Sequence, residues 1–90
     1  MAWKIEFTKK AKKEFIKLDK TTQKQISKFI SKIEYSYDPK NFGEALTGDL
    51  HMFWKYRVGN YRLICNMKDD VFMVQIIRIG HRREVYKKEI

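Results

Sequence analysis

One segment decides the fold, the stretch Phe53-Trp54-Lys55-Tyr56-Arg57-Val58-Gly59-Asn60-Tyr61-Arg62-Leu63-Ile64. Apolar and polar side chains alternate on both sides of Gly59-Asn60, which is the period of strands with one buried face. A Gly-Asn pair between two such runs is a signal for a two-residue hairpin turn. We therefore predict an antiparallel hairpin, with a first strand from Leu50, in which Arg57 faces Arg62.

The two faces of this predicted hairpin differ in chemistry. One face is apolar and carries Trp54, Tyr56, Val58, Tyr61, Leu63 and Cys65. The other face carries Lys55, Arg57, Arg62 and Asn66. Like charges that face each other across a sheet cost a few tenths to about 1 kcal/mol, so the pairing of Arg57 with Arg62 indicates a binding surface rather than a purely structural one.

A third strand is predicted after the hairpin. Lys68-Asp69-Asp70 is expected to form a three-residue turn, and the apolar run 71–79 is typical of a central strand covered on both faces. That turn would pair Arg62 with Ile76 and bring Arg78 near Arg62 on the same face, whereas a two-residue turn would reverse this parity.

The first half of the chain is predicted to form a strand and two helices. Trp3-Lys4-Ile5-Glu6-Phe7 alternates like a strand, and Thr8 is placed to cap a short amphipathic helix over residues 9–18. Thr22 and Gln25 have the spacing of a capping box. They predict the start of a second helix, whose apolar stripe consists of Ile26, Phe29, Ile30 and Ile33.

These elements predict an α+β fold in a single domain over residues 1–90. Tyr37-Asp38-Pro39 is expected to end the second helix, and residues 38–49 form an irregular connection. The order is then an N-terminal strand, a helical hairpin and a three-stranded antiparallel meander, all in one small sheet. A chain of 90 residues supports one modest core and excludes large multi-domain enzymes.

Composition narrows the function further. The 20 Lys and Arg against 11 Asp and Glu give a net charge of +9, which favours a polyanionic partner such as nucleic acid or the ribosome. All arginines follow residue 56, whereas residues 1–40 carry only lysine as a cation. The helical lysines are either a solvated surface or a contact to ribosomal RNA.

Several classes of protein are not expected. The apolar run 71–77 is too short to span a bilayer, and no signal segment follows Met1, so we expect a cytoplasmic protein without a membrane partner. One cysteine and two histidines cannot assemble a structural zinc site, and we expect neither a metal nor another cofactor. Cys65 falls on the predicted core face and is expected to act as a small apolar residue.

A basic tail follows Gly80, which is expected to end the third strand. It reads His81-Arg82-Arg83-Glu84-Val85-Tyr86. Arg82 and Tyr86 share a face whether this tail is helical or extended.

The hairpin segment 53–64, together with residues 79–86, resembles the RelE family of toxins of toxin–antitoxin systems, within the wider RelE/ParE superfamily. The similarity covers most of the chain, because the order of strand, helical hairpin and meander is also that of the family. It implies a RelE-like fold and a ribosome-dependent endoribonuclease that cuts messenger RNA in the A site. It also implies a RelB-like antitoxin as the inhibiting partner, which we expect to be acidic.

The same resemblance implies a set of site residues. Positions that matter for cleavage in the family fall on Lys55, Arg62, Arg82 and Tyr86. Phe53 stands where some members carry a second lysine. Further RNA contacts are expected from Arg57, Arg78, His81 and Arg83.

These residue types predict metal-free cleavage, in which the ribose 2′-hydroxyl attacks its own phosphate. Arg62 and Arg82 are suited to grip phosphate oxygens with two hydrogen bonds each. The base stays open between Lys55, His81 and Tyr86. Two alternatives to the ribonuclease function remain open: a ParE-like toxin that inhibits DNA gyrase, and a basic nucleic-acid-binding module without catalytic activity.

Overall fold

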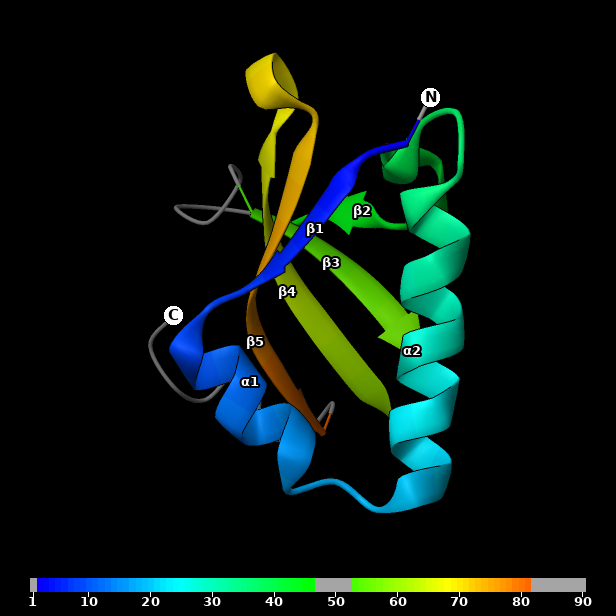
Figure 1. Ribbon diagram of the computed structural model, residues 1–90, viewed down its shortest axis with the longest axis vertical. Coiled ribbons are helices and arrows are strands. Elements are labelled where there is room, and N and C mark those ends of the chain that lie inside the picture. The colour runs from blue at the N-terminus through cyan, green and yellow to red at the C-terminus, as the bar shows by residue number, and fades with distance from the viewer. Residues whose placement is uncertain (1, 47–52, 82–90) are drawn as a thin grey trace.

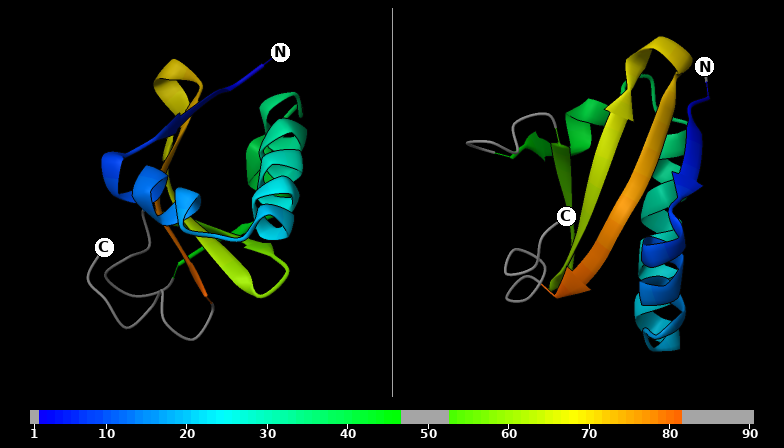
Figure 2. Two further views of the ribbon diagram at one scale, coloured as in Figure 1. Left: turned by 60° about the horizontal axis from the view of Figure 1, so that its bottom comes forward. Right: turned by 90° about the vertical axis from the view of Figure 1, so that its left-hand side faces the viewer.

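The computed structural model describes residues 2–46 and 53–81. Within them, a single sheet has the strand order β1-β5-β4-β3-β2, and two α-helices pack on one of its faces (Figure 1; Figure 2, right). The elements are β1 (Lys4–Phe7), α1 (Lys9–Ile16), α2 (Lys20–Glu34), the 3-10 helix η1 (Pro39–Phe42), β2 (Glu44–Ala45), β3 (Phe53–Val58), β4 (Tyr61–Lys68), the 3-10 helix η3 (Asp69–Val71) and β5 (Met73–His81).

The predicted α+β class is confirmed, with one more strand than expected. Strand β2 lies in the stretch that the sequence suggested was irregular, and it pairs with β3 through Glu44 with Lys55 and Ala45 with Trp54. Two residues are too few to show an alternating pattern, so the sequence carries no signal for this strand. The part of the predicted strand at residues 50–52 lies outside the described residues.

Both helices begin at a side-chain cap. The prediction for Thr8 is confirmed, since its hydroxyl accepts a hydrogen bond from the Ala11 amide at 3.1 Å. The predicted capping box at Thr22 is wrong, because Asp19 caps α2 by accepting from the Thr22 amide at 3.0 Å. Hydrogen bonds from the side chain of Thr22 and from its amide together lower the pKa of Asp19. Asp19 is therefore the N-cap residue, and Thr22 lies inside α2.

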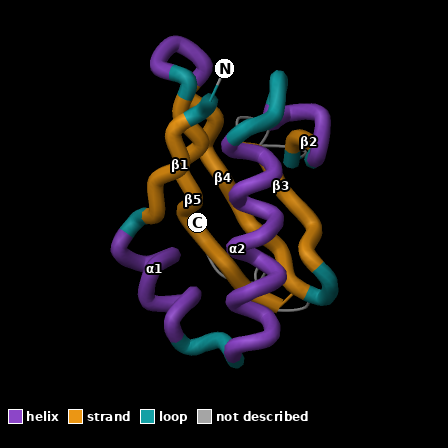
Figure 3. Tube along the Cα trace, turned by 45° about the vertical axis from the view of Figure 1, so that its right-hand side comes forward, coloured by secondary structure: helices purple, strands orange, loops and turns teal. Residues whose placement is uncertain are grey.

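The main core lies between the helices and the inner face of the sheet, where α2 runs across the strands (Figure 3). It is built from Trp3, Ala11, Ile26, Ile33, Tyr56, Val58, Leu63, Cys65, Val74, Ile76 and Ile79. The predicted inner position of Cys65 is confirmed, and burial raises the pKa of its thiol. The opposite, outer face holds a smaller apolar cluster of Leu46, Phe53, Ile64 and Ile77.

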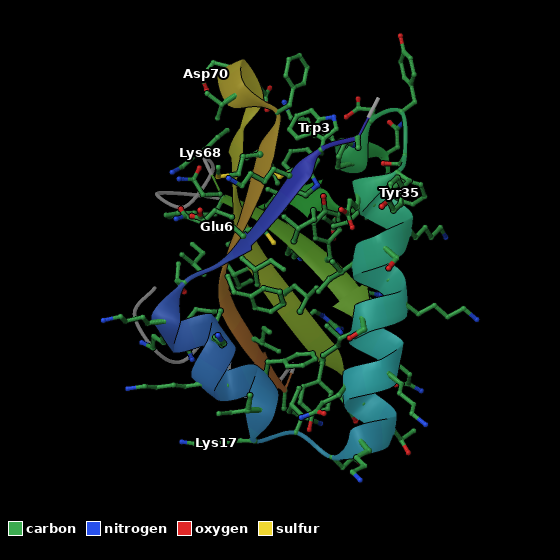
Figure 4. The ribbon with its side chains drawn as sticks, in the orientation of Figure 1. Trp3, Glu6, Lys17, Tyr35, Lys68 and Asp70 are labelled. Carbon is green, nitrogen blue, oxygen red and sulfur yellow. The ribbon has the colours of Figure 1, made fainter. Side chains whose placement is uncertain are left out.

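The helices present their lysines to solvent. Exposed lysines occur at positions 9, 10, 12, 13, 17, 20, 24, 28 and 32, and Lys17 at the end of α1 extends away from the sheet (Figure 4). None of the described helices is long and apolar enough to span a membrane.

The predicted register between the second and third meander strands is wrong. Arg62 pairs with Gly80 rather than with Ile76, and Met67 pairs with Val74. The connection is longer than predicted because η3 and Phe72 both belong to it, and Phe72 has a left-handed backbone with φ of 51°. Gly80 also does not end the strand, which continues to His81.

A bulge then shifts the pairing along β5. Cys65 pairs with Ile76 and Ile64 with Arg78, which leaves Ile77 as the additional residue. Such a bulge increases the local twist of the sheet.

Helix α1 covers the edge of β5 where β1 leaves the sheet. The Thr8 amide donates to the Ile76 carbonyl at 3.0 Å, and the Glu14 carboxylate accepts from the Ile79 amide at 2.9 Å. The same carboxylate pairs with the Arg78 guanidinium at 3.1 Å. Arg78 is 2% exposed, so its charge is balanced inside the protein by Glu14.

We expect Glu14→Ala to destabilise the fold by about 3–5 kcal/mol, because it leaves the buried Arg78 charge without this partner. The double variant Glu14→Leu/Arg78→Met should recover most of the loss, since it removes both charges together. Urea unfolding measures both effects, with Glu34→Ala as a control. A double variant no more stable than Glu14→Ala would show that the ion pair is not the cause.

Candidate functional site

A cavity of about 290 Å³ opens on the part of the sheet that holds the predicted cations. Its walls are formed by Asn41, Phe42, Gly43, Glu44, Lys55, Arg57 and Arg62. Lys55, Arg57 and Arg62 alternate with the core residues Tyr56, Val58 and Leu63, so they belong to the outer face of the sheet, away from the helices. The structure therefore brings three predicted site residues into one cavity.

The hairpin register fixes this arrangement. Arg57 pairs with Arg62, Lys55 with Ile64 and Phe53 with Asn66, as the Gly59-Asn60 turn predicts. Gly59 has φ of 58°, a backbone conformation that glycine adopts without a steric penalty. The two-residue loop thus sets which side chains share the outer face.

Each of the three cations has a different environment. Lys55 pairs with Glu44 across the β2–β3 ladder, with 3.3 Å between the ammonium and the carboxylate. Arg62 is 8% exposed and donates to the carbonyls of Tyr61 at 3.0 Å and Gly59 at 3.4 Å. Arg57 is exposed and forms no ion pair with a described residue. The cavity therefore holds one accessible cation, one paired cation and one held by backbone.

The wall opposite the cations depends on a close approach of two chain segments. A Cβ atom at Gly43 would lie 2.3 Å from the Lys55 carbonyl oxygen and 2.8 Å from the Trp54 indole nitrogen. The buried Tyr56 hydroxyl donates to the Pro39 carbonyl at 2.8 Å and ties η1 to the sheet. Desolvation raises the pKa of Tyr56. These contacts hold η1 and β2 against β3.

Other predicted site residues lie elsewhere. The guanidinium of Arg78 is buried against Glu14 of α1 and does not line the cavity. His81 pairs with Tyr61, and their rings meet edge to face at 5.8 Å between centroids. Its place in the ladder puts His81 on the face of Tyr61, not on that of Arg62. The predicted residues Arg82, Arg83 and Tyr86 lie outside the described residues.

Two wall residues, Asn41 and Glu44, were missed by reasoning from the sequence. Both lie in the stretch 38–49 that was predicted to be an irregular connection. The Gly43-Glu44 pair carries no motif, and only the pairing of β2 with β3 brings its carboxylate to Lys55. Phe53, which replaces the lysine of some relatives, packs instead in the outer apolar cluster with Ile64.

The cavity is chemically suited to an anion. Three cationic side chains converge on it, and two of them are arginines with several directed donors. Within residues 2–46 and 53–81, no three His, Cys, Asp or Glu side chains gather closely enough to hold a metal ion. The polar groups of the described wall are thus three cations, one amide and one carboxylate, beside the Phe42 ring and the Gly43 backbone.

The class of protein follows from the match to a known family. The family model described as the ParE toxin of the type II toxin–antitoxin system parDE matches residues 5–86, and the chain belongs to this family. More particularly, its similarity to the toxins RelG and RelE and to a toxin chain of a RelBE complex makes it a RelE-family toxin of a RelBE-type system.

Individual relatives show the same similarity. Toxin RelG of Mycobacterium tuberculosis is 27% identical over 88 residues, which cover 98% of this chain and all of RelG. The mRNA interferase toxin RelE of Escherichia coli is 31% identical over 94 residues, covering 100% of this chain and 96% of that protein. The crystal structure of the toxin–antitoxin complex RelBE2 from Mycobacterium tuberculosis matches with a TM-score of 0.71 and 25% identity, over 91% of this chain and all of the matched chain.

We expect Arg57→Gln to stabilise the fold by about 0.2–1 kcal/mol, because it removes the like charge that faces Arg62 across the ladder. The same change should weaken binding to a polyanion, because Arg57 is the exposed cation of the cavity. Urea unfolding and the salt dependence of RNA binding measure the two effects. Lys4→Gln, which removes an exposed lysine of β1 outside the cavity wall, is the control with the same loss of charge. A destabilised Arg57→Gln protein would contradict the expected repulsion.

Proposed function

We propose that this toxin is a ribosome-dependent endoribonuclease that cleaves messenger RNA in the A site and so inhibits translation. The observation that carries the proposal is the cavity in which Lys55, Arg57 and Arg62 meet on the outer face of the sheet. An anionic phosphodiester fits that charge, and the similarity to a protein named an mRNA interferase supports the reaction type.

The proposed reaction needs no metal ion. The 2′-hydroxyl attacks the adjacent phosphate, the bond to the 5′-oxygen breaks, and the products carry a cyclic phosphate and a free 5′-hydroxyl. In this proposal Lys55 and Arg62 stabilise the charge that builds on the phosphate. Arg82 and Tyr86 complete the catalytic set, and Arg57 and Arg83 contact the RNA. Arg78 is left out of this set because Glu14 holds it inside the protein.

The proposed partners are an acidic RelB-like antitoxin and the translating ribosome, both in the cytoplasm. The antitoxin is supported by the similarity to a toxin chain solved as a complex with its antitoxin. The charge of +9 supports both partners, since an acidic segment and ribosomal RNA are each attracted to it.

Translation with purified ribosomes tests the proposal. Primer extension on the message should reveal cuts within the A-site codon, and a 2′-deoxy nucleotide at the cut position should abolish them. Growth arrest by this chain alone, with rescue by an acidic protein encoded beside it, should accompany the cuts. Intact message together with inhibited DNA gyrase supercoiling would favour a ParE-like activity instead, which the name of the family model makes the second candidate.

Two sets of substitutions should separate cleavage from binding. Arg62→Ala removes an arginine from the cavity, so we expect a loss of about 10²–10³-fold in single-turnover cleavage on saturated ribosomes. Changing Lys9, Lys13, Lys24 and Lys28 to Gln should leave that rate near wild type, because these side chains lie on the exposed helix surface. Their loss should lower ribosome affinity and flatten its salt dependence.

Thermal unfolding of both proteins is the control for folding. A lysine variant with unchanged affinity and salt slope would identify the helix lysines as a solvated surface. An Arg62→Ala protein that binds weakly but cuts at the wild-type rate would make Arg62 a docking residue.

A further inference from the structure

We propose that the cavity also binds a nucleobase, and that the Phe42 ring stacks on the base of one nucleotide that flanks the scissile phosphate. The inference rests on the proposed RNA cleavage and deepens it, because it assigns a base-binding residue to the same cavity. Phe42 lies outside the two sequence motifs at residues 53–64 and 79–86.

The described wall of the cavity combines positive charge with an aromatic ring. Lys55, Arg57 and Arg62 supply the charge from β3 and β4, and Phe42 supplies the ring from the last position of η1. The volume of about 290 Å³ lies near the lower end of the range for small-ligand sites, about 300–1,000 Å³. A nucleotide has an anionic phosphate and a flat base, so this wall complements a nucleotide better than a phosphate group alone.

The Phe42 ring is accessible at this wall. The residue is 36% exposed, and it belongs to neither of the two apolar clusters that the described residues form. The core aromatic residues Phe29 and Tyr56, in contrast, meet edge to face at 5.2 Å between ring centroids. An exposed ring offers a face on which an unstacked RNA base can lie, and stacking removes apolar surface of both rings from water.

The backbone that carries Phe42 is held on both sides. Before it, the Tyr56 hydroxyl donates to the Pro39 carbonyl at the start of η1. After it, Gly43 approaches β3 so closely that a Cβ atom there would lie 2.3 Å from the Lys55 carbonyl oxygen. A ring on a segment that is already fixed loses little conformational freedom when a base binds.

A lysine of α2 adds positive charge beside the ring. The Lys32 ammonium lies over the Phe42 ring at 4.9 Å from its centroid, within the range of a cation–π interaction. A stacked base would then lie on the opposite face of the ring. Lys32 thus extends the cationic surroundings of the cavity toward α2, where a neighbouring phosphate of the RNA strand would be attracted.

The competing role for Phe42 is purely structural. The ring would then only pack against Lys32 and help to hold η1, and its replacement would affect every message to the same extent. Stacking predicts instead that the effect of replacing Phe42 depends on the presence of the base. A cycle that removes the ring, the base or both therefore separates the two roles.

Binding to programmed ribosomes tests the inference without cleavage. The message carries a 2′-deoxy nucleotide at the cut position, and each nucleotide that flanks the scissile phosphate is in turn replaced by an abasic one. We expect the wild-type protein to bind about 5- to 150-fold more weakly when one of these two bases is missing, which is the contribution of one base stacked on an aromatic ring. Phe42→Leu should bind the intact and the abasic message equally, both as weakly as the wild type binds the abasic one.

Two further variants are the controls. Phe42→Tyr retains an aromatic ring and should retain the dependence on the base. Phe72→Leu makes the same change as Phe42→Leu at a residue that is 46% exposed and lies outside the cavity wall, and it should bind like the wild type. Thermal unfolding verifies that each variant is folded.

The outcomes separate this inference from the proposed function. Equal binding of the wild type to the intact message and to both abasic messages would overturn the assignment. A folded Phe42→Leu protein that keeps the full dependence on the base would also overturn it. On a cleavable message, the same pattern should appear in kcat/KM. Base-dependent binding without any cleavage would retain the base-binding site and refute the proposed ribonuclease function itself.

Discussion

The β3–β4 hairpin is the constraint on which the rest of this structure depends. Its two-residue turn fixes the register, and the register assigns Tyr56 and Leu63 to the core and Arg57 and Arg62 to the outer face. A shift of one residue would exchange the faces of one strand, burying cations and exposing core residues. The β3–β4 ladder therefore fixes both the core and the cationic cavity. A shift that changed the core face would also move the cations of that strand away from the cavity.

The sequence predicted this hairpin well because its signals are local. Alternation over several residues and a Gly-Asn turn are both contained within the paired segment, and the observed pairs of Arg57 with Arg62 and Phe53 with Asn66 follow from them. The β4–β5 register could not be predicted in the same way. It depends on Phe72 in a left-handed conformation and on a bulge near Arg78, neither of which has a sequence signature.

The residues of the candidate site differ in the same way between those with local sequence signals and those placed by contacts between distant segments. Lys55, Arg57 and Arg62 were found because they lie on the hairpin, whereas Glu44 was missed because a two-residue strand brings it there from a distant segment. Arg78 was predicted from the sequence as a site residue, but it does not line the cavity. Its charge suggested an RNA contact, but a carboxylate on α1, remote in the sequence, pairs with it inside the protein. Tertiary contacts between segments decide which charged residues reach the cavity.

The cations on the helices and those in the cavity have different surroundings, which suit them to different roles. The lysines on the helices are exposed and spread over α1 and α2, where solvent screens them, so they act on association at most. The cations of the cavity lie on paired strands, and Arg62 is nearly buried with its guanidinium held by two carbonyls. A fixed cation in a partly desolvated cavity stabilises developing charge more strongly than a mobile one in water, because no reorganisation is needed during the reaction. The repulsion between Arg57 and Arg62 is thus a local cost in stability that maintains a positive potential in the cavity, the place that the proposed function assigns to an RNA phosphate.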